Sequence, residues 1–455
     1  MSEPTLVPSL DQVADQLVAL VGEHKLPSLA VAVAHGNQVQ ARGFGTADLE
    51  GRPATGDTPY LLASVTKPLV GTLCALLAQQ GLIDLDEPLG DRLPWLDEKN
   101  RATVRQALSH TAGFGRYWDF AYGEPTPELE YVVQRYGVQI RPPGTRFEYA
   151  NLGYGVLEPW LLAATEQPLA ELLRRHLFEP FGLTSGAFGP GAGGPQAAVQ
   201  YTAEKLLPYP TIYSSHSAAG MAWMSAADLA RFGQLHVKGT TALTPASAAA
   251  VRRPGVAPAS KGADVYGLGL NVRRPGGVEV LTHLGDMCGV GASIAILPEQ
   301  GVSVAAVINR TGSCLQARTA CELLLDGLVS RIGSDDGPPP SAVRAIGEWA
   351  GYAETPTGRV PLRLGVTADE AAWVEVAGGA RIPARLEADE SYDVMFAADV
   401  QLPTPDAMLA SPWLELALDV QTDRLVGSAR AVKHGEAGDR VGNCLTHWCE
   451  LERVQ

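Results

Sequence analysis

The sequence predicts an α/β protein: an antiparallel sheet flanked by helices, with an inserted helical subdomain and a C-terminal all-β domain. Three observations lead to this fold class. A strand-like apolar run and a hairpin turn lie between residues 28 and 45. The strand pattern returns between residues 266 and 309, after a long helical and proline-rich stretch. Beyond the prolines at 338–340, short alternating segments indicate further strands.

The first elements can be read from local patterns. Apolar residues in the segment 10–23 recur at helical spacing, and the segment 28–34 is apolar enough for a buried strand. His35-Gly36-Asn37 predicts a hairpin turn into a second strand, 38–45. The next helix is expected to end near Gly81, and it tolerates Pro68 because this residue lies in the first turn.

Domain boundaries follow from changes in pattern. Residues from about 84 to 225 form the expected helical subdomain, inserted into a catalytic domain at 1–335 that ends with a helix. The segment 334–340 is acidic and rich in proline, as in a linker. Alternating segments after it predict a small antiparallel barrel or sandwich at 341–455. We expect this last domain to be a stabilising lid or an oligomer surface without chemistry of its own.

Composition excludes several classes of partner. The chain has 455 residues, 46% of them apolar, and a formal charge of −15, so it can bury a large core but lacks the basic surface that nucleic acid or an anionic membrane requires. The N-terminus has neither the basic nor the apolar region of a signal peptide, and no run reaches the ~18 apolar residues of a membrane helix. We expect a cytoplasmic protein; the sequence leaves open a signal peptide already removed.

Cysteine and histidine spacing indicates neither a metal nor another cofactor. The six cysteines form no C-x-x-C motif, and no H-E-x-x-H motif occurs. Reduced, buried thiols are expected, with pairing of Cys444 and Cys449 as the alternative.

The strongest chemical signal is Ser64-Val65-Thr66-Lys67. A serine and a lysine three residues apart at the start of a helix lie on the same face. The lysine can then take or stabilise the proton of the serine, and the helix N-terminus favours the negative charge that develops. This is the spacing of a serine acyl-transfer nucleophile, and Lys67 is the one lysine of seven with a serine three residues before it. The ordinary alternative is a helix start with a solvated lysine.

Two further segments follow in the chain. Tyr149-Ala150-Asn151 is the single Y-x-N, and His283-Leu284-Gly285 lies between two strand-like runs. The order S-x-x-K, Y-x-N, [K/H]-x-G resembles the serine β-lactamase and penicillin-binding-protein superfamily, above all its class C-like branch of esterases, D-aminopeptidases and acyltransferases. Other segments resemble this branch over residues 10–330: Leu108–Phe114, Ala219–Leu229 and Tyr266–Leu270. The resemblance implies a β-lactamase-like fold.

The resemblance also implies roles. Ser64 would be the nucleophile, and Lys67 and Tyr149 would share its proton, with Tyr149 protonating the leaving group and later activating water or another acceptor. An ammonium with the ordinary pKa of ~10.4 is no base, so burial or a nearby cation must lower the pKa of Lys67. The phenol needs positive charge nearby, which Lys67 and His283 could supply. The sequence does not fix which of the two groups holds the proton.

Further residues complete the expected site. Asn151 would orient Lys67 and the substrate carbonyl, or else cap a helix. The backbone amides of Ser64 and Asp286 would form the oxyanion hole, and Gly285 would let the strand approach the substrate.

His283 stands where β-lactamases typically carry K-(T/S)-G, and His-Leu-Gly looks more like D-aminopeptidases and esterases; the alternative is a structural histidine on a strand. Aromatic residues near loops are candidates for the acyl pocket, with ordinary packing as the alternative: Tyr117, Trp118, Phe120, Tyr213 and Trp223. His110 is expected to be structural.

These features predict a serine hydrolase acting on small ester or amide substrates, D-amino-acid derivatives among them. An acyltransferase using the same acyl-enzyme with an amine or alcohol acceptor is the close alternative. A non-catalytic penicillin-recognising sensor is the other. No G-x-S-x-G occurs, which argues against an α/β-hydrolase.

Overall fold

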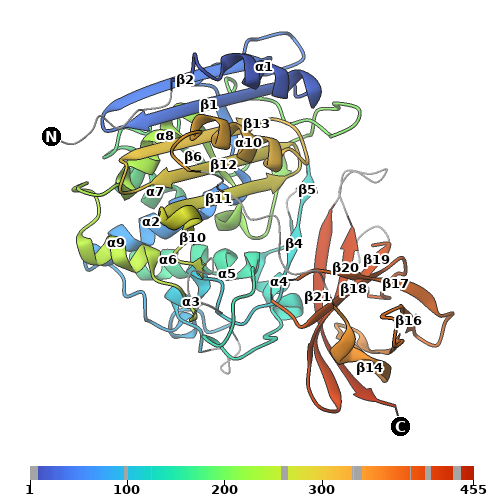
Figure 1. Cartoon of the computed structure of the whole chain (residues 1–455). Helices are drawn as coiled ribbons and strands as arrows, with labels where there is room; N and C mark the ends of the chain where they lie inside the picture. Colours follow the sequence, from blue (N-terminus) through green and yellow to red (C-terminus); the bar gives the residue numbers. More distant parts are fainter. Residues whose placement is uncertain are drawn as a thin grey trace.

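The computed structural model describes residues 9–96, 101–123, 126–257, 265–329, 332, 341–389, 391–404, 411–433 and 442–454 (Figure 1). Residues 1–8, in which the sequence shows no signal-peptide pattern, and the expected linker at 334–340 lie outside the described residues.

A seven-stranded antiparallel sheet forms the centre of the N-terminal domain, in the order β2-β1-β13-β12-β11-β10-β9 (Figure 1). Strands β12 and β13 are buried along their whole length because helices cover both faces of the sheet. The strands are β1 (Ser28–His35), β2 (Gln38–Gly45), β9 (Val265–Tyr266), β10 (Asn271–Arg273), β11 (Val280–Met287), β12 (Val290–Leu297) and β13 (Val302–Ile308).

Helices lie on both faces of this sheet. On one face α1 (Ala14–Glu23) and α10 (Cys314–Leu324) share a core with Leu29 and Val31 of β1. On the other face α2 (Thr66–Gln79) and α8 (Ala226–Gly233) share a core with the alternate residues of β1, which are alanines. Small side chains let α8 approach the sheet closely. The predicted α/β class, with an antiparallel sheet flanked by helices, is confirmed.

Helices and short strands between β2 and β9 form a layer beside the sheet. The helices are α3 (Val104–Leu108), α4 (Leu129–Tyr136), α5 (Asn151–Gly155), α6 (Leu157–Thr165), α7 (Leu169–Leu173) and α9 (Pro245–Arg252). The strands are β3 (Pro59–Leu61), β4 (Trp118–Asp119), β5 (Ala121–Tyr122), β6 (Ala187–Phe188), β7 (Ile212–Tyr213) and β8 (Ala222–Ser225). This layer contains the helices that the sequence assigned to a subdomain at 84–225.

The C-terminal domain is a closed antiparallel barrel, so of the two predicted forms it is the barrel. Each strand pairs with the next, and β14 pairs with β21 to close the ring. The β4 strand of the N-terminal domain adds to β21, where Trp118 pairs with Cys444. The strands are β14 (Gly347–Thr355), β15 (Gly358–Val366), β16 (Ala372–Val376), β17 (Ile382–Glu387), β18 (Val394–Ala398), β19 (Trp413–Val420), β20 (Arg424–Lys433) and β21 (Asn443–Arg453).

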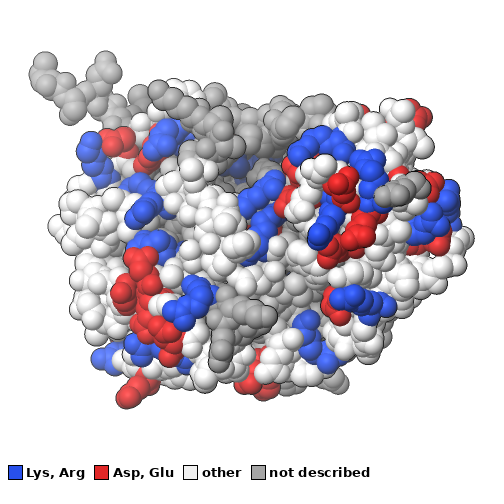
Figure 2. All heavy atoms as spheres, turned by 90° about the horizontal axis from the view of Figure 1, so that it is seen from below, with Lys and Arg blue, Asp and Glu red and all other residues white. Residues whose placement is uncertain are grey.

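The described part of the chain contains no helix both long and apolar enough to cross a bilayer. All six cysteines are free, including Cys444 and Cys449, which lie on the single strand β21. On the face shown in Figure 2, basic and acidic side chains are intermixed rather than gathered into one basic surface.

Candidate active site

Ser64 lies in a 3-10 turn, Ala63–Val65, that leads directly into α2. The residue before it, Ala63, has a φ of +48°, a left-handed conformation that costs an L-residue roughly 1–2 kcal/mol. The turn is fixed because the amide of Leu62 donates to the carbonyl of Ala222 at 2.8 Å. The serine is therefore held at the positive end of the α2 dipole, where an oxyanion is favoured.

Lys67 is completely buried, one turn into α2. Its Nζ donates to the carbonyl oxygen of Ala219 at 2.9 Å and lies 3.0 Å from Ser64 Oγ. Burial lowers the pKa of Lys67 well below the ordinary value because the ammonium loses its hydration. A neutral amine at this distance can accept the proton of Ser64.

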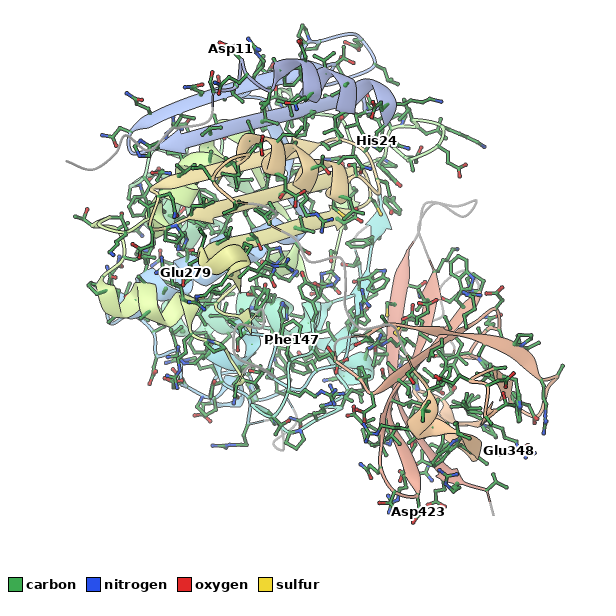
Figure 3. The ribbon with its side chains drawn as sticks, viewed as in Figure 1. Asp11, His24, Phe147, Glu279, Glu348 and Asp423 are labelled. Carbon is green, nitrogen blue, oxygen red and sulfur yellow. The ribbon has the colours of Figure 1, made fainter. Side chains whose placement is uncertain are left out.

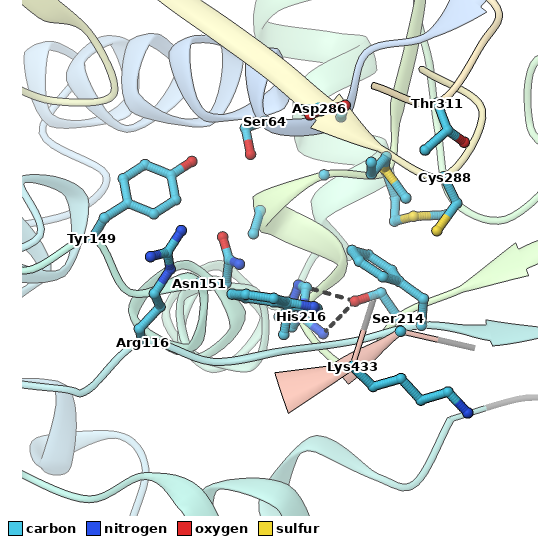
Figure 4. A pocket seen from close by; sticks show the side chains of 18 residues that line it. Ser64, Arg116, Tyr149, Asn151, Ser214, His216, Asp286, Cys288, Thr311 and Lys433 are labelled. Atoms are coloured by element: carbon cyan, nitrogen blue, oxygen red, sulfur yellow. Dashed lines mark hydrogen bonds between the residues drawn. The ribbon is translucent and has the colours of Figure 1, made fainter. Parts of the chain in front are cut away.

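Tyr149 lies next to the same hydroxyl. Its phenol points toward Ser64 (Figure 4), and Lys67 Nζ is 4.7 Å from the centre of its ring. Burial raises the pKa of Tyr149 above the ordinary value of 10.0, while the Ser64 hydroxyl and the charge of Arg116 act in the other direction. Both partners of Ser64 are thus driven toward their neutral forms, an amine and a phenol.

His110 holds the chain on both sides of Tyr149. Its Nδ1 accepts from the amide of Ala150 at 3.1 Å, and its carbonyl oxygen accepts from the amide of Glu148 at 2.9 Å. The imidazole lies against the phenol with ring centres 4.2 Å apart. Burial lowers the pKa of His110 well below its ordinary value, so the ring is neutral. His110 lies in the segment Leu108–Phe114, and the structural role predicted for it agrees with these contacts.

The Asn151 side chain neither contacts Lys67 nor caps a helix, the two roles expected for it. Asn151 is the first residue of α5, whose cap is Ala150, and its side chain caps nothing. Its Nδ2 donates to the carbonyl oxygen of Tyr117 at 2.9 Å, and the partners of Lys67 are Ser64 and Ala219 instead. The buried Oδ1 has no partner among the described residues and lies in the wall of the cavity (Figure 4). This atom can accept a hydrogen bond from a substrate N–H.

His283 lies on β11 behind Tyr149, outside the residues that line the Ser64 cavity. Its Nδ1–H donates to the carbonyl of Leu284 at 2.6 Å, and its Nε2 accepts from the Tyr266 hydroxyl at 2.9 Å. Burial is the main cause that lowers the pKa of His283 to about 3. The ring is therefore neutral and both its nitrogens are hydrogen-bonded. It does not supply the positive charge near the phenol that the sequence led us to expect.

Gly285 acts between two backbone segments rather than against a substrate. A Cβ at this position would lie 2.3 Å from the carbonyl oxygen of Leu62, so β11 touches the turn that carries Ser64. Gly285 does not line the cavity, whereas Ser64 and Asp286 both do. The oxyanion hole formed by the amides of Ser64 and Asp286 stays a prediction, and this packing brings its two halves to one end of the cavity.

A cavity of about 430 Å³ opens in front of Ser64 (Figure 4). Trp118 and Phe120 line it, as expected of an acyl pocket. Residues that the sequence analysis did not single out also line it: Arg116, Ser214, His216, Met221, Met287, Cys288, Thr311, Lys433 and Gly442. The last two belong to the barrel side of the molecule, which the sequence analysis expected to carry no chemistry.

Three of the expected aromatic residues do not line the cavity. Tyr117 stacks on Tyr136 with ring centres 5.6 Å apart. The indole of Trp223 donates to the carbonyl of Gly189 at 2.9 Å, and Tyr213 lies in the two-stranded sheet of β5 and β7. Aromatic residues near loops are as often packing as binding residues, and the sequence offers no signal that separates the two.

His216 and Ser214 form a polar floor that the sequence analysis missed. The Ser214 hydroxyl and His216 Nδ1 are 2.9 Å apart (Figure 4), and burial lowers the pKa of His216 to about 3. Among the described residues, no group of three or more His, Cys, Asp and Glu side chains is placed to hold a metal ion.

The chain is similar to several known proteins. The chain is 26% identical to the unguisins hydrolase ungD' of Aspergillus campestris over 331 residues, which cover 65% of this chain and 60% of that protein. The chain spans about half to three fifths of the length of the first curated relatives it matches.

Two solved structures are similar in fold. SurE with D-Leu superimposes over 98% of this chain and 99% of its own, with a TM-score of 0.65 and 23% identity. A D-amino acid amidase from Ochrobactrum anthropi SV3, complexed with L-phenylalanine amide, covers 69% of this chain and 97% of its own, with a TM-score of 0.57 and 22% identity. The family model described as Beta-lactamase matches residues 10–325. The chain belongs to the β-lactamase family of the serine β-lactamase and penicillin-binding-protein superfamily.

Proposed function

We propose that this chain is a serine hydrolase that forms an acyl-enzyme on Ser64 and cleaves small ester or amide derivatives of D-amino acids. One observation carries the proposal: the Nζ of a fully buried Lys67 lies 3.0 Å from Ser64 Oγ, at the end of a cavity of about 430 Å³. A lysine held neutral by burial is the base that a serine hydroxyl requires.

The reaction would proceed in two halves. As Ser64 Oγ bonds to the substrate carbonyl carbon, its proton passes to Lys67, and the amides of Ser64 and Asp286 stabilise the oxyanion. Tyr149 then protonates the leaving group as its bond to carbon breaks, and a proton returns from Lys67 to the phenol. In the second half water is the nucleophile. It loses a proton to Lys67 and Tyr149, and Ser64 leaves the acyl group with its own proton restored.

Asn151 supports an amino-acid substrate. Its Nδ2 is occupied by the Tyr117 carbonyl, so the atom it offers to the cavity is the acceptor Oδ1. An acceptor beside the nucleophile suits a substrate with an N–H next to the scissile carbonyl, and a buried acceptor left unpaired disfavours one without it. Among similar proteins, the ones named for D-Leu and for a D-amino acid amidase support the D configuration.

Acyl transfer is the second candidate. The cavity extends from Ser64 to Lys433 of the barrel, and Ser214 and His216 offer polar contacts along it. This length can hold an amine or alcohol acceptor beside the acyl group, and the acceptor would replace water in the second half-reaction.

The test uses D- and L-phenylalanine p-nitrophenyl esters and p-nitroanilides, the des-amino 3-phenylpropionyl ester and a cephalosporin, followed by absorbance and intact mass. We expect turnover of the D compounds, with the transient acyl mass on Ser64. Ser64→Ala should lose several orders of magnitude of activity, about 10⁶-fold in the extreme. The control is Ser247→Ala on α9, whose hydroxyl lies 3.0 Å from that of Thr244 and outside the cavity lining; it should behave as wild type.

Three outcomes separate the alternatives. Full activity of Ser64→Ala would overturn the proposal, and a permanent adduct without turnover would favour a sensor. An added amine that captures the acyl group in preference to water would identify an acyltransferase. Asn151→Leu should lose the preference for the aminoacyl over the des-amino ester, and an unchanged preference would remove Asn151 from substrate selection.

A further inference from the structure

We propose that the C-terminal barrel is part of the machinery for acylation: through the side chain of Glu148 it fixes Tyr149 beside Ser64. This inference rests on the proposed function, because it assumes that Tyr149 transfers a proton. It assigns a positioning role to Tyr392 and Arg430 of the barrel, in a domain that the sequence analysis expected to carry no chemistry.

Glu148 immediately precedes Tyr149 and is 95% buried, with 5% of its surface exposed. The Tyr392 hydroxyl, just before β18, lies 2.8 Å from each carboxylate oxygen. Arg430 of β20 contacts the same carboxylate at 3.4 Å, and Arg141 of the N-terminal domain contacts it at 3.2 Å. Two of the three side chains that hold this carboxylate therefore come from the barrel.

The barrel contacts are themselves buried. Arg430 has 1% of its surface exposed and lies 3.6 Å from Asp389 and 3.5 Å from Glu415, both in the barrel. Its Nε donates to Ser428 at 3.1 Å. Removing one partner of such a buried network leaves uncompensated charge behind, so the arrangement has little freedom to shift.

A second contact holds the start of the segment that leads to Tyr149. Arg141 donates from Nε and Nη2 to the carboxylate of Asp419 at 3.0 and 2.9 Å, and from Nη2 to the carbonyl of Ser391 at 2.6 Å. Its guanidinium lies 4.1 Å from the ring centre of Tyr392. The segment 141–148 is thus bound to the barrel at both of its ends.

These contacts bear directly on the phenol. The main chain at residue 149 is held on one side by His110, through the amides of Glu148 and Ala150, and on the other by the carboxylate of Glu148. The Tyr149 ring is joined to the main chain by a single CH2 group, which cannot compensate for a shift of the backbone. The phenol therefore moves with residue 148. In Figure 3, Phe147, two residues before Tyr149, lies in the N-terminal domain, and Glu348 and Asp423 lie in the barrel beside it.

The experiment is a double-mutant cycle between Tyr392→Phe and Tyr149→Phe. Tyr392→Phe removes the hydroxyl from Glu148 and keeps the ring that Arg141 covers. We expect kcat/KM for the D-phenylalanine ester to fall by about 10- to 100-fold, with the loss in kcat rather than KM, as for a reacting group displaced by up to 1 Å. In the Tyr149→Phe background Tyr392→Phe should cost nothing further, because it acts through the missing hydroxyl.

The matched control is Tyr352→Phe on β14, whose hydroxyl meets Glu450 at 3.4 Å on the barrel wall. It should keep wild-type kcat/KM. All variants are assayed below their measured melting temperatures, so a loss of fold is visible separately. Should Tyr392→Phe not fold, Glu148→Gln replaces it, since the amide keeps an acceptor for Tyr392, and the same absence of additivity is expected.

The outcomes distinguish a failure of the proposed function from a failure of the role proposed for the barrel. Wild-type activity of Tyr149→Phe would overturn the proposed mechanism itself. Loss of activity in Tyr149→Phe, combined with wild-type kinetics of Tyr392→Phe or with two losses that multiply, would overturn the role of the barrel and leave the proposed function standing.

Discussion

Gly285→Ala should separate the two halves of the predicted oxyanion hole. Gly285 belongs to β11, directly before Asp286, and a Cβ added to it would meet the carbonyl oxygen of Leu62 at 2.3 Å. Leu62 lies two residues before Ser64 in the turn that presents the nucleophile. The added methyl group therefore acts on both parts of the site at once.

The structure gives the size of the displacement. An ordinary van der Waals contact of a Cβ begins at 3.4 Å, so strand and turn must separate by about 1.1 Å, the difference between 3.4 and 2.3 Å. The Leu62 oxygen is a backbone atom and the added Cβ is bonded directly to the backbone, so no side-chain rotation can relieve the contact. A misplacement of about 1 Å costs roughly 10²-fold in rate, so kcat/KM should fall by about this factor.

The assay measures kcat/KM for a D-phenylalanine p-nitrophenyl ester, with the melting temperature recorded for each variant. Gly22→Ala is the matched control, because a Cβ at Gly22 has no atom within 4 Å. A Gly285→Ala enzyme with the activity of the control would refute the reasoning, and so would a loss confined to the melting temperature.

Three more predictions follow from buried groups. Because burial depresses the pKa of Lys67 and raises that of Tyr149, kcat/KM should rise with pH to a plateau that begins below the ordinary pKa of lysine. A pH–rate profile still rising through pH 10 would contradict the neutral amine. Burial raises the pKa of Glu158 from 4.5 to about 7, so the folded state binds the proton more tightly, and the stability this contributes is complete below pH 4.5 and lost as pH rises through 7. Glu158→Gln should therefore stabilise the protein at pH 8, by up to about 3 kcal/mol, and change little at pH 4 in urea unfolding. Trp349→Ala should lower the unfolding free energy by about 3–5 kcal/mol, because this indole is fully buried in the barrel core, and a loss below 1 kcal/mol would contradict that packing.

The parts of the fold that the sequence predicted are those set by local patterns. The strand from residue 28 was recognisable because burial on both faces leaves an uninterrupted apolar run, and Gly36, at a φ of +56°, forms the hairpin turn that follows. Closure of the barrel was not predictable in this way. It depends on the pairing of β14 with β21, which are far apart in the chain, and neither strand carries a local signal for its partner.

In the site, too, the residues set by local patterns were predictable, and those set by tertiary packing were not. Ser64 and Lys67 were predictable because one helical turn brings them together, and Tyr149 because its motif follows in a recognisable order. Lys433 could not be found, since it reaches the cavity only through the packing of one domain on the other. The state of His283 depends on a Tyr266 hydroxyl and on burial, which a three-residue motif does not contain.

The presence or absence of the barrel should affect which residues members of the family carry before the Y-x-N tyrosine. The D-amino acid amidase matches 97% of its own chain to 69% of this one, so the catalytic fold exists in shorter chains. In the present chain the segment before Tyr149 carries three charged side chains, Arg141, Arg146 and Glu148, whose partners include Asp419, Tyr392 and Arg430 of the barrel.

A chain without a barrel would expose those charges to water and lose the contacts that hold them. It would have to fix its tyrosine by other means, and an uncharged residue before it would then suffice. We therefore expect the acidic residue before the Y-x-N tyrosine to occur together with the barrel and with an arginine at the position of Arg430. A sequence comparison that found this glutamate equally often in chains of both lengths would argue that Glu148 serves the N-terminal domain alone.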